Sequence, residues 1–253
     1  MSKKPTGIHT NRREFLATGA SLGLGTMAAA SALSACKSSE DVEWNEETDV
    51  LIVGAGGAGL TAAIEALRAG AAVVLLEKAE EHGGSTALSG GVIQAAGTAP
   101  QEAQGITGDT PQKHFEYYEQ AGEGIPTPEL LHLITDEAPE AIAFMQDLGM
   151  PYNAVYGVGT IPTVDPELMV DRIHVPGDEV VVGAGSGHVA LLKEEVDALG
   201  GDIRTLATAE RLIFDSEEGV VGVRVDINGS TVNFRARRAV VLASGGFDWN
   251  TDL

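Results

Sequence analysis

Three closely spaced glycines follow an apolar run near residue 50 of the chain. Residues 50–53 (VLIV) predict a strand that is buried on both faces. Gly54 permits a tight turn after this strand, Gly56 lets the backbone approach a pyrophosphate, and Gly59 lets the next helix pack against the strand. The spacing therefore predicts a site for the phosphates of a dinucleotide.

The segments that follow these glycines support the same prediction. A helix is expected from about Gly57 to Ala69, and the amides of its first turn, at Gly57 and Ala58, would point at the phosphates. A second buried strand, residues 72–76, ends at Glu77, whose carboxylate can accept both hydroxyls of an adenosine ribose. Strand, helix, strand and acid in this order favour a dinucleotide-binding fold over a chance glycine-rich turn.

A second glycine cluster, residues 83–91 (GGSTALSGG), comes shortly after Glu77. Two glycine pairs this close suit a loop whose bare amides lie against a flat, anionic ligand, with hydroxyl groups as additional donors. The alternative is a flexible surface loop. The position directly after a dinucleotide unit favours ligand binding, and the candidate residues are Gly83, Gly84, Ser85, Thr86, Ser89, Gly90 and Gly91.

These motifs together resemble a known family. The segments GAGGAG, LLEK and GGSTALSGG are similar to flavoproteins of the fumarate reductase and succinate dehydrogenase group, and the loop spacing is closest to the 3-ketosteroid dehydrogenase branch. The resemblance covers residues 49–253 and implies FAD, with its ADP half on the first glycines, Glu77 and Lys78, and its flavin ring over residues 84–91. Members with covalent flavin carry a histidine where this chain has Gly84, so the resemblance implies non-covalent FAD.

Strand patterns dominate the last 50 residues. The resemblance implies that a strand at residues 203–207 returns to the central sheet and that Ala209 offers its amide to adenine. Strands at residues 220–227 and 231–235, joined by a two-residue turn, predict a small antiparallel layer. A last buried strand, residues 239–242, ends in small residues that resemble the family segment ATGG and would meet the cofactor: Ala243, Ser244 and Gly245.

Helical periodicity separates the glycine clusters from these strands. Helices are expected over residues 111–121, from residue 128 to before Gly149 with a restart at Pro139, and from about residue 186 to 199. His188, near the start of the third helix, is more typical of a surface histidine than of a dinucleotide contact.

An irregular stretch at residues 152–187 holds most of the potentially reactive groups. In steroid dehydrogenase relatives a tyrosine from this region reaches the substrate, so the resemblance makes Tyr156 the first, weak catalytic candidate; the catalytic residues are otherwise unknown. Structural or solvated roles are the default for every member of the group, which comprises Tyr152, Tyr156, Asp165, Arg172 and His174.

The first 36 residues are predicted to be a targeting signal and not part of the fold. The segment RREFL at residues 12–16 resembles a twin-arginine export signal, and LSAC, ending at Cys36, resembles a lipoprotein box whose cysteine is lipidated. A membrane-spanning helix is the alternative, but several glycines and serines make the run only mildly apolar. The sequence thus predicts an exported periplasmic or cell-surface protein, with membrane contact only through lipid on Cys36, and residues 37–47 as an acidic tether.

The amino-acid composition limits the kinds of partner and ligand that this protein can have. The formal net charge is −21 and no basic stripe is present, so nucleic acid is excluded as a partner. The single cysteine rules out an internal disulfide and a cysteine metal cluster, and no metal site is predicted. The motif CxxCH is absent, so beside a small-molecule substrate we expect a separate electron donor or acceptor, either another chain or a segment missing from this sequence.

The sequence therefore predicts an α/β chain with a Rossmann-like FAD-binding domain over residues 48–253. It has a parallel central sheet and a small antiparallel layer, and the resemblance implies that a cap domain and a C-terminal half follow in the longer protein. The function implied is an FAD enzyme that oxidises or reduces a carbon–carbon bond next to a carbonyl. The alternatives are a non-catalytic FAD-binding module and, less favoured because of the GGSTALSGG loop, an NAD-dependent dehydrogenase.

Overall fold

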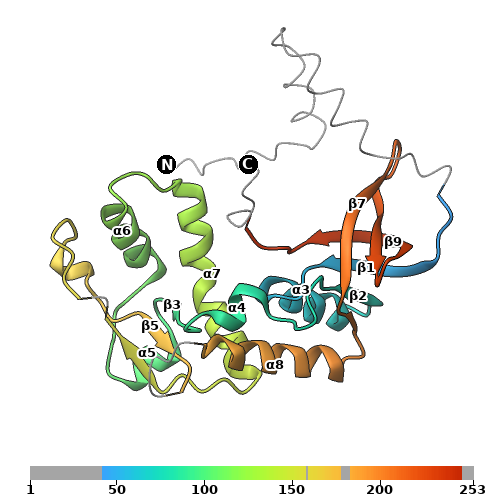
Figure 1. Cartoon of the computed structure of the whole chain (residues 1–253). Helices are drawn as coiled ribbons and strands as arrows, with labels where there is room; N and C mark the ends of the chain where they lie inside the picture. The colour runs from blue at the N-terminus through green and yellow to red at the C-terminus, as the bar shows by residue number, and fades with distance from the viewer. Residues whose placement is uncertain (1–41, 158, 178–182, 247–253) are drawn as a thin grey trace, which may run out of the picture.

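The structure is a computed structural model, and it describes residues 42–157, 159–177 and 183–246. The predictions for residues 1–41, including lipidation of Cys36, lie outside the described residues. A six-stranded sheet stands on one side of the molecule, and a helical region with a small three-stranded sheet stands on the other (Figure 1). Among the described residues, no helix has the length and apolar character needed to span a membrane.

The central sheet confirms the α/β class. Its strand order is β6-β2-β1-β9-β8-β7; the first four strands are parallel, and β8 and β7 are added antiparallel. The bounds are β1 (Glu46–Val53), β2 (Val73–Leu76), β6 (Asp202–Arg204), β7 (Ala207–Asp215), β8 (Gly219–Ile227) and β9 (Ser230–Leu242).

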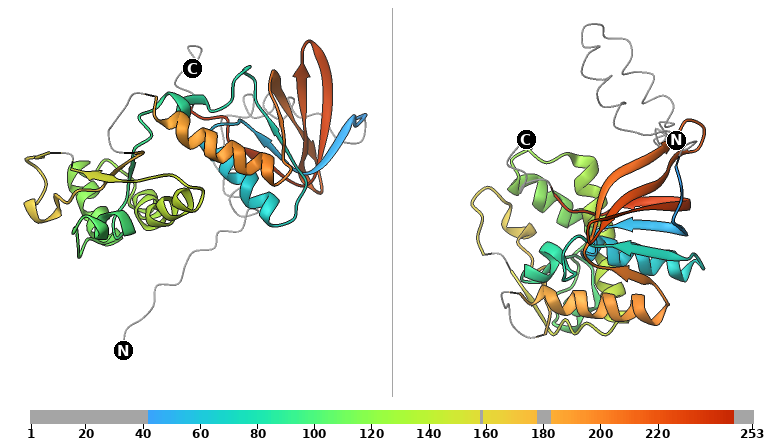
Figure 2. Two further views of the ribbon diagram at one scale, coloured as in Figure 1. Left: turned by 90° about the horizontal axis from the view of Figure 1, so that it is seen from below. Right: turned by 45° about the vertical axis from the view of Figure 1, so that its right-hand side comes forward.

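Residues 50–53 of β1 lie between two cores, as their apolar run predicts: Leu51 and Ile52 are fully buried, and Val50 and Val53 are partly buried. Ile52 packs into a core with the helices α3 (Gly57–Arg68) and α8 (Gly185–Ala198), which lie side by side. Figure 2 shows this helix pair beneath the sheet. Leu51 faces the opposite side and packs with Val223 and Phe234 of the antiparallel strands. The two cores hold the carboxyl ends of β1 and β2 in place.

Strand β9 is one continuous strand, so the prediction of two separate strands at residues 231–235 and 239–242 is wrong. Its first half pairs antiparallel with β8 and its second half pairs parallel with β1. The hairpin therefore extends the central sheet instead of forming a layer over it. The charged residues between these two segments lie on the surface, where Arg237 donates hydrogen bonds to Asp49 at 2.8 Å and Glu47 at 3.0 Å.

Strand β1 also begins earlier than predicted. Glu46 and Glu47, assigned from the sequence to the tether, pair with residues of β9. Glu46 accepts a hydrogen bond from Arg204 at 2.6 Å, which links the first strand to β6. These ion pairs make an acidic segment compatible with a strand.

The helical region consists of α5 (Ala99–Ala103), α6 (Pro111–Ala121) and α7 (Pro128–Asp147), with a 3₁₀ turn η2 (Pro166–Leu168). Helix α7 runs through Pro139 without a restart, contrary to prediction. A proline costs one backbone hydrogen bond and a local clash, but Leu131, Ile142 and Met145 stay buried on one face along the whole helix. The stretch predicted to be irregular contains β4 (Ala154–Tyr156) and β5 (Ile173–Val175), which form a sheet with β3 (Ile93–Gln94).

Candidate functional site

The two glycine clusters, far apart in the sequence, meet at the carboxyl end of β1. Gly56 and Gly83 form a parallel β-bridge, and the Gly83 amide donates to the Ala55 carbonyl at 2.8 Å. The Gly57 amide donates to the Thr86 hydroxyl oxygen at 3.1 Å. The sequence placed both clusters at one ligand, and the structure brings them into direct contact.

Local structure differs from the prediction at two points. Residues Gly84–Leu88 form a short helix, α4, so the second cluster is a turn and one helical segment instead of an open loop. The Gly57 amide is capped by Thr86, so the first-turn amides left for phosphates are those of Ala58 and Gly59. The Ser89 hydroxyl donates to the Thr86 carbonyl at 2.8 Å and accepts from the Gly91 amide at 3.1 Å. It holds the loop together internally.

Each of the three glycines of the first motif is explained by a different physical constraint. Gly54 adopts φ +104°, and a Cβ there would lie 2.4 Å from the Ala243 carbonyl oxygen. A Cβ at Gly59 would lie 1.8 Å from the Gly54 oxygen, so helix and strand could not approach. A Cβ at Gly56 would meet no protein atom closer than 3.7 Å. Since packing does not require Gly56, its bare backbone fits the close approach of a ligand.

Several predicted cofactor residues converge on a small cavity of about 130 Å³ beside β1 and β2. The Glu77 carboxylate is buried in its wall and accepts from the Ala55 amide at 3.0 Å and the Ala79 amide at 2.9 Å. Each carboxylate oxygen keeps a further lone pair for a ribose hydroxyl. The cavity is lined by Val53, Gly54, Leu76, Glu77, Lys78, Ala207, Thr208, Ala209 and Ser244.

A larger cavity of about 600 Å³ lies on the other side of the Gly57–Thr86 contact. Four predicted residues line it: Gly57, Thr86, Ser89 and Gly91. The opposite wall comes from α7 and is apolar at Ala141, Phe144 and Met145, with Glu137 and Glu140 beside them. The other predicted cofactor residues line neither cavity; they are Gly56, Ala58, Gly59, Gly83, Gly84, Ser85, Gly90, Ala243 and Gly245. The Ala243 amide donates to the Val53 carbonyl at 2.8 Å.

The five potentially reactive residues of the stretch 152–187 lie in different environments in the structure. Tyr156, the first catalytic candidate, is 44% exposed on the edge strand β4 and lines neither cavity. Asp165 caps η2 by accepting from the Glu167 amide at 2.9 Å. Arg172, His174 and Tyr152 are buried. The group is therefore mostly structural, and Tyr156 stays a prediction.

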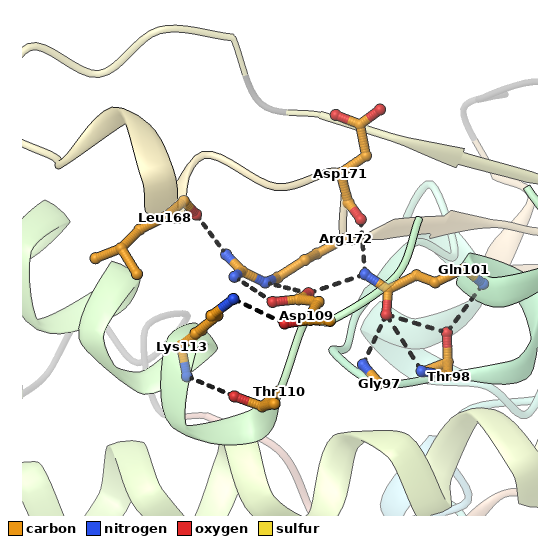
Figure 3. A network of polar contacts seen from close by, with 10 residues as sticks. Gly97, Thr98, Gln101, Asp109, Thr110, Lys113, Leu168, Asp171 and Arg172 are labelled. Atoms are coloured by element: carbon orange, nitrogen blue, oxygen red, sulfur yellow. Dashed lines mark hydrogen bonds and ion pairs between the residues drawn. The ribbon is translucent and has the colours of Figure 1, made fainter. Parts of the chain in front are cut away.

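Arg172 is the centre of a buried polar network (Figure 3). It donates to both carboxylate oxygens of Asp109, at 2.8 and 2.6 Å, and to the Leu168 carbonyl at 2.9 Å. Gln101 also donates to Asp109 at 2.9 Å and accepts from the amides of Gly97 and Thr98. The sequence analysis missed Asp109, Gln101 and Thr98, although the T-x-x-Q spacing of a capping box could have revealed the last two.

His114 lies beside this network, and its burial should make the free energy of unfolding depend on pH. It is fully buried, and neither ring nitrogen has a hydrogen-bond partner among the described residues. Burial, and next the Arg172 cation, lower the pKa of His114 from 6.5 to about 4. The unfolded chain therefore binds the extra proton first as the pH falls below 6.5, and stability is lost from there toward pH 4.

Between pH 7 and pH 4.5 the native protein should lose about 2 to 3 kcal/mol more unfolding free energy than His114→Phe. The phenylalanine keeps an aromatic ring against Tyr118, whose ring centroid lies 4.7 Å from that of His114. Urea denaturation at the two pH values measures the difference. The same substitution at exposed His132 is the control and should keep the native pH dependence. Parallel pH profiles for native protein and His114→Phe would contradict the prediction.

His188 corrects another prediction. It is 5% exposed, not a surface histidine, and its Nε2 lies 2.8 Å from the Tyr152 hydroxyl. Burial lowers the pKa of His188 and raises that of Tyr152, so both are neutral.

In the described part of the chain, no cluster of histidine, cysteine and acidic side chains is arranged to hold a metal ion.

Comparison with known proteins agrees with this geometry. Residues 49–251 match the family model described as FAD binding domain. The acrylate reductase flavoprotein subunit of Shewanella woodyi is 32% identical over 96% of the chain, and the urocanate reductase of Eggerthella lenta 33% identical over 82%. The chain spans 47% and 33% of these two relatives.

Solved structures give the same result. The 3-ketosteroid-Δ4-(5α)-dehydrogenase from Rhodococcus jostii RHA1, in complex with 4-androstene-3,17-dione, superposes with a TM-score of 0.76 and 31% identity, over 84% of this chain and 49% of that one. The open form of a flavocytochrome c3 fumarate reductase gives 0.71 and 27%, over 89% and 37%. The chain therefore belongs to the FAD-binding domain family of the fumarate reductase and succinate dehydrogenase flavoproteins.

Proposed function

We propose that this protein is an FAD-dependent oxidoreductase that acts on a carbon–carbon bond next to a carbonyl, in a ketosteroid or an unsaturated carboxylate. The observation that carries the proposal is the convergence of the two glycine clusters and the Glu77 carboxylate at the carboxyl ends of β1 and β2. Relatives of about 30% identity are named as reductases of acrylate, fumarate and urocanate.

The residues present fit FAD. The small cavity combines Glu77, for ribose hydroxyls, with the backbone of Ala209, for the adenine edge. The uncrowded backbone at Gly56 and the first-turn amides of Ala58 and Gly59 suit the pyrophosphate. Gly90 and Gly91 would lie toward the flavin ring. Bound FAD would supply hydride exchange with the substrate; the chain's part is to bind, orient and shield it from water.

FAD should be released intact when the protein is denatured, because the resemblance places glycine, not histidine, at the position of covalent attachment. We expect the intact protein to purify yellow, with about one FAD per chain in the supernatant after acid precipitation. Absorbance spectra before and after precipitation measure this. Colourless protein that does not bind added FAD would contradict the cofactor assignment. Flavin retained in the pellet would contradict only the prediction that FAD is bound non-covalently.

The alternative is a non-catalytic FAD-binding module. In it, FAD would bind with the expected stoichiometry, yet reduced flavin would not be reoxidised by fumarate, acrylate, urocanate or an enone steroid. Anaerobic reoxidation of the reduced protein by each compound distinguishes the two functions. An NAD-dependent dehydrogenase would bind nicotinamide nucleotide in preference to FAD.

Location and partners are proposed from the sequence alone. The RREFL and LSAC segments support export by the twin-arginine route and lipid anchoring at Cys36. The 253 residues given contain no CxxCH motif, so we propose that electrons are exchanged with another chain or with a further segment of the longer protein. The strongly acidic chain gives no support to a nucleic-acid partner.

A further inference from the structure

Helix α7 carries two apolar faces, and the described part of the chain covers only one of them. Leu131 and Met145 are buried on the inner face. A second row of residues recurs at three- and four-residue spacing about a third of a turn away, and its members Leu130, Leu133 and Ile134 are between 56% and 59% exposed. We call this row the outer stripe; it consists of Leu130, Leu133, Ile134, Glu137, Ala141 and Phe144.

The outer stripe continues into the cavity of about 600 Å³. Its last three members, Glu137, Ala141 and Phe144, form one wall of the cavity, and Thr61 of α3 and Leu192 of α8 lie on the others. Protein interiors are close-packed, and a space of this size holds several large side chains. Contiguous apolar surface of this kind marks a place where another segment or molecule packs. The stripe and the cavity therefore form one docking surface.

Carboxylates interrupt this apolar surface. Glu137 lies in the middle of the outer stripe and Glu140 lies beside it, and neither forms a hydrogen bond or an ion pair with another described residue. The third acid in the cavity wall, Glu65, lies 3.6 Å from Arg68. Within the described chain, no lysine or arginine lines the cavity. A segment that covers this surface must pair the carboxylates that it buries, because an unpaired buried charge is strongly destabilising.

A second copy of the chain is a poor occupant of this surface. In a two-fold dimer the outer stripe would meet itself and bring Glu137 and Glu140 of both copies together. The chain has 37 acidic and 16 basic residues, so repulsion between like charges would add to the cost.

The rest of the longer protein is a better occupant. The chain spans 47% of the acrylate reductase subunit and 49% of the ketosteroid dehydrogenase. The described chain leaves β9 beside Gly54, where the Ala243 carbonyl oxygen would lie 2.4 Å from an added Cβ, and Gly57 of the same turn lines the cavity. A segment that continues from this point is tethered next to the docking surface, and tethering raises its effective concentration above that of a free partner.

We propose that a segment of the longer protein, C-terminal to Leu253, covers the outer stripe, fills the large cavity with apolar side chains and places a lysine or arginine against Glu137. This inference goes beyond the proposed function, because it requires neither FAD nor a substrate.

Thiol labelling of the intact, longer protein tests whether the stripe is covered. Leu133→Cys lies in the stripe, and Ile125→Cys, between α6 and α7, is the matched control. In the described chain alone these side chains are 59% and 88% exposed, a difference of less than twofold. We expect maleimide to modify Leu133→Cys at least about tenfold more slowly, because a covered thiol reacts only when the covering segment opens. Peptide mass spectrometry identifies the modified thiol, and the rates should not depend on FAD or on protein concentration.

Charge reversal tests the predicted cation. Glu137→Lys would bring two cations together under the covering segment, and we expect the equilibrium constant for unfolding of the intact protein to rise about 100-fold. Asp136→Lys makes the same change at the next residue, whose side chain is 56% exposed outside the stripe, and should change the constant less than about threefold. Urea denaturation at pH 7 measures both constants.

Equal labelling rates at the two cysteines would show a free surface and overturn the proposal. Slow labelling of Leu133→Cys that becomes fast on dilution would assign the stripe to a second copy, and slow labelling only with FAD would assign the cavity to the cofactor; both results overturn it. Equal effects of Glu137→Lys and Asp136→Lys would overturn the pairing with Glu137. FAD titration of the same samples is independent: native protein that does not bind FAD would contradict the proposed function and leave this inference intact.

Discussion

Replacing Arg172 with methionine is expected to lower the free energy of unfolding by about 4 kcal/mol. The guanidinium is 2% exposed and forms two hydrogen bonds to Asp109, whose side chain is 1% exposed. Without the arginine, the side-chain amide of Gln101, at 2.9 Å, is the only donor to the Asp109 carboxyl group among the described residues, and this buried group has lost its ion-pair partner. Urea denaturation at pH 7 measures the loss, which is a large share of the stability of an ordinary domain.

The double variant Asp109→Leu/Arg172→Met tests the cause. Removing both charges leaves no uncompensated ion, so most of the lost stability should return. Arg237→Met is the surface control; its bonds to Glu47 and Asp49 are exposed to solvent, and we expect a much smaller change in the unfolding free energy than for Arg172→Met. A double variant as unstable as Arg172→Met would mean that packing around the arginine, including its 5.4 Å contact with the Tyr117 ring, dominates over charge.

Gly56→Ala should weaken FAD binding about 100-fold while leaving the unfolding free energy of the apoprotein within about 1 kcal/mol of native. The added Cβ meets no protein atom closer than 3.7 Å, but it occupies the space through which the pyrophosphate would approach the backbone. Flavin fluorescence titration gives the affinity, and urea denaturation of the apoprotein gives the stability.

Gly59→Ala is the matched comparison in the same motif. Its Cβ would lie 1.8 Å from the Gly54 oxygen, so α3 must move away from β1, and we expect a loss of about 3 kcal/mol in the apoprotein itself. The two alanines thus separate ligand contact from packing within one glycine motif. Unchanged FAD affinity in Gly56→Ala, with native stability, would show that the first glycine cluster does not face the cofactor.

How much of the site the sequence could predict depends on how local each signal is. The turn at Gly54, the helix from Gly57 and the acid at Glu77 are consecutive, and backbone sterics and strand burial act over a few residues; the structure has all three as predicted. Tyr156 and His188 show the opposite case. The sequence favours Tyr156 as a catalytic residue, but it lies on an exposed edge strand; the sequence predicts a surface position for His188, but it is buried against Tyr152.

The same limit applies to the polar network. Asp109 and Arg172 are 63 residues apart, and nothing in either local segment indicates that they form a buried pair. Local rules also penalise a proline inside a helix, such as Pro139, and charged residues inside a strand, such as the arginines of β9. Burial of one face of α7 and ion pairs with β1 outweigh these penalties, and both are contacts between distant segments.

The sequence by itself determined the dinucleotide unit and the α/β class, because glycine geometry and hydrophobic periodicity are short-range properties of the chain; the family followed from the resemblance of its motifs. Only the tertiary structure decided that Thr86 caps Gly57, that β9 joins the hairpin to the central sheet, and that His188 is buried against Tyr152. These features depend on which surfaces pack together, and packing is fixed by the summed burial of many distant residues rather than by any one segment.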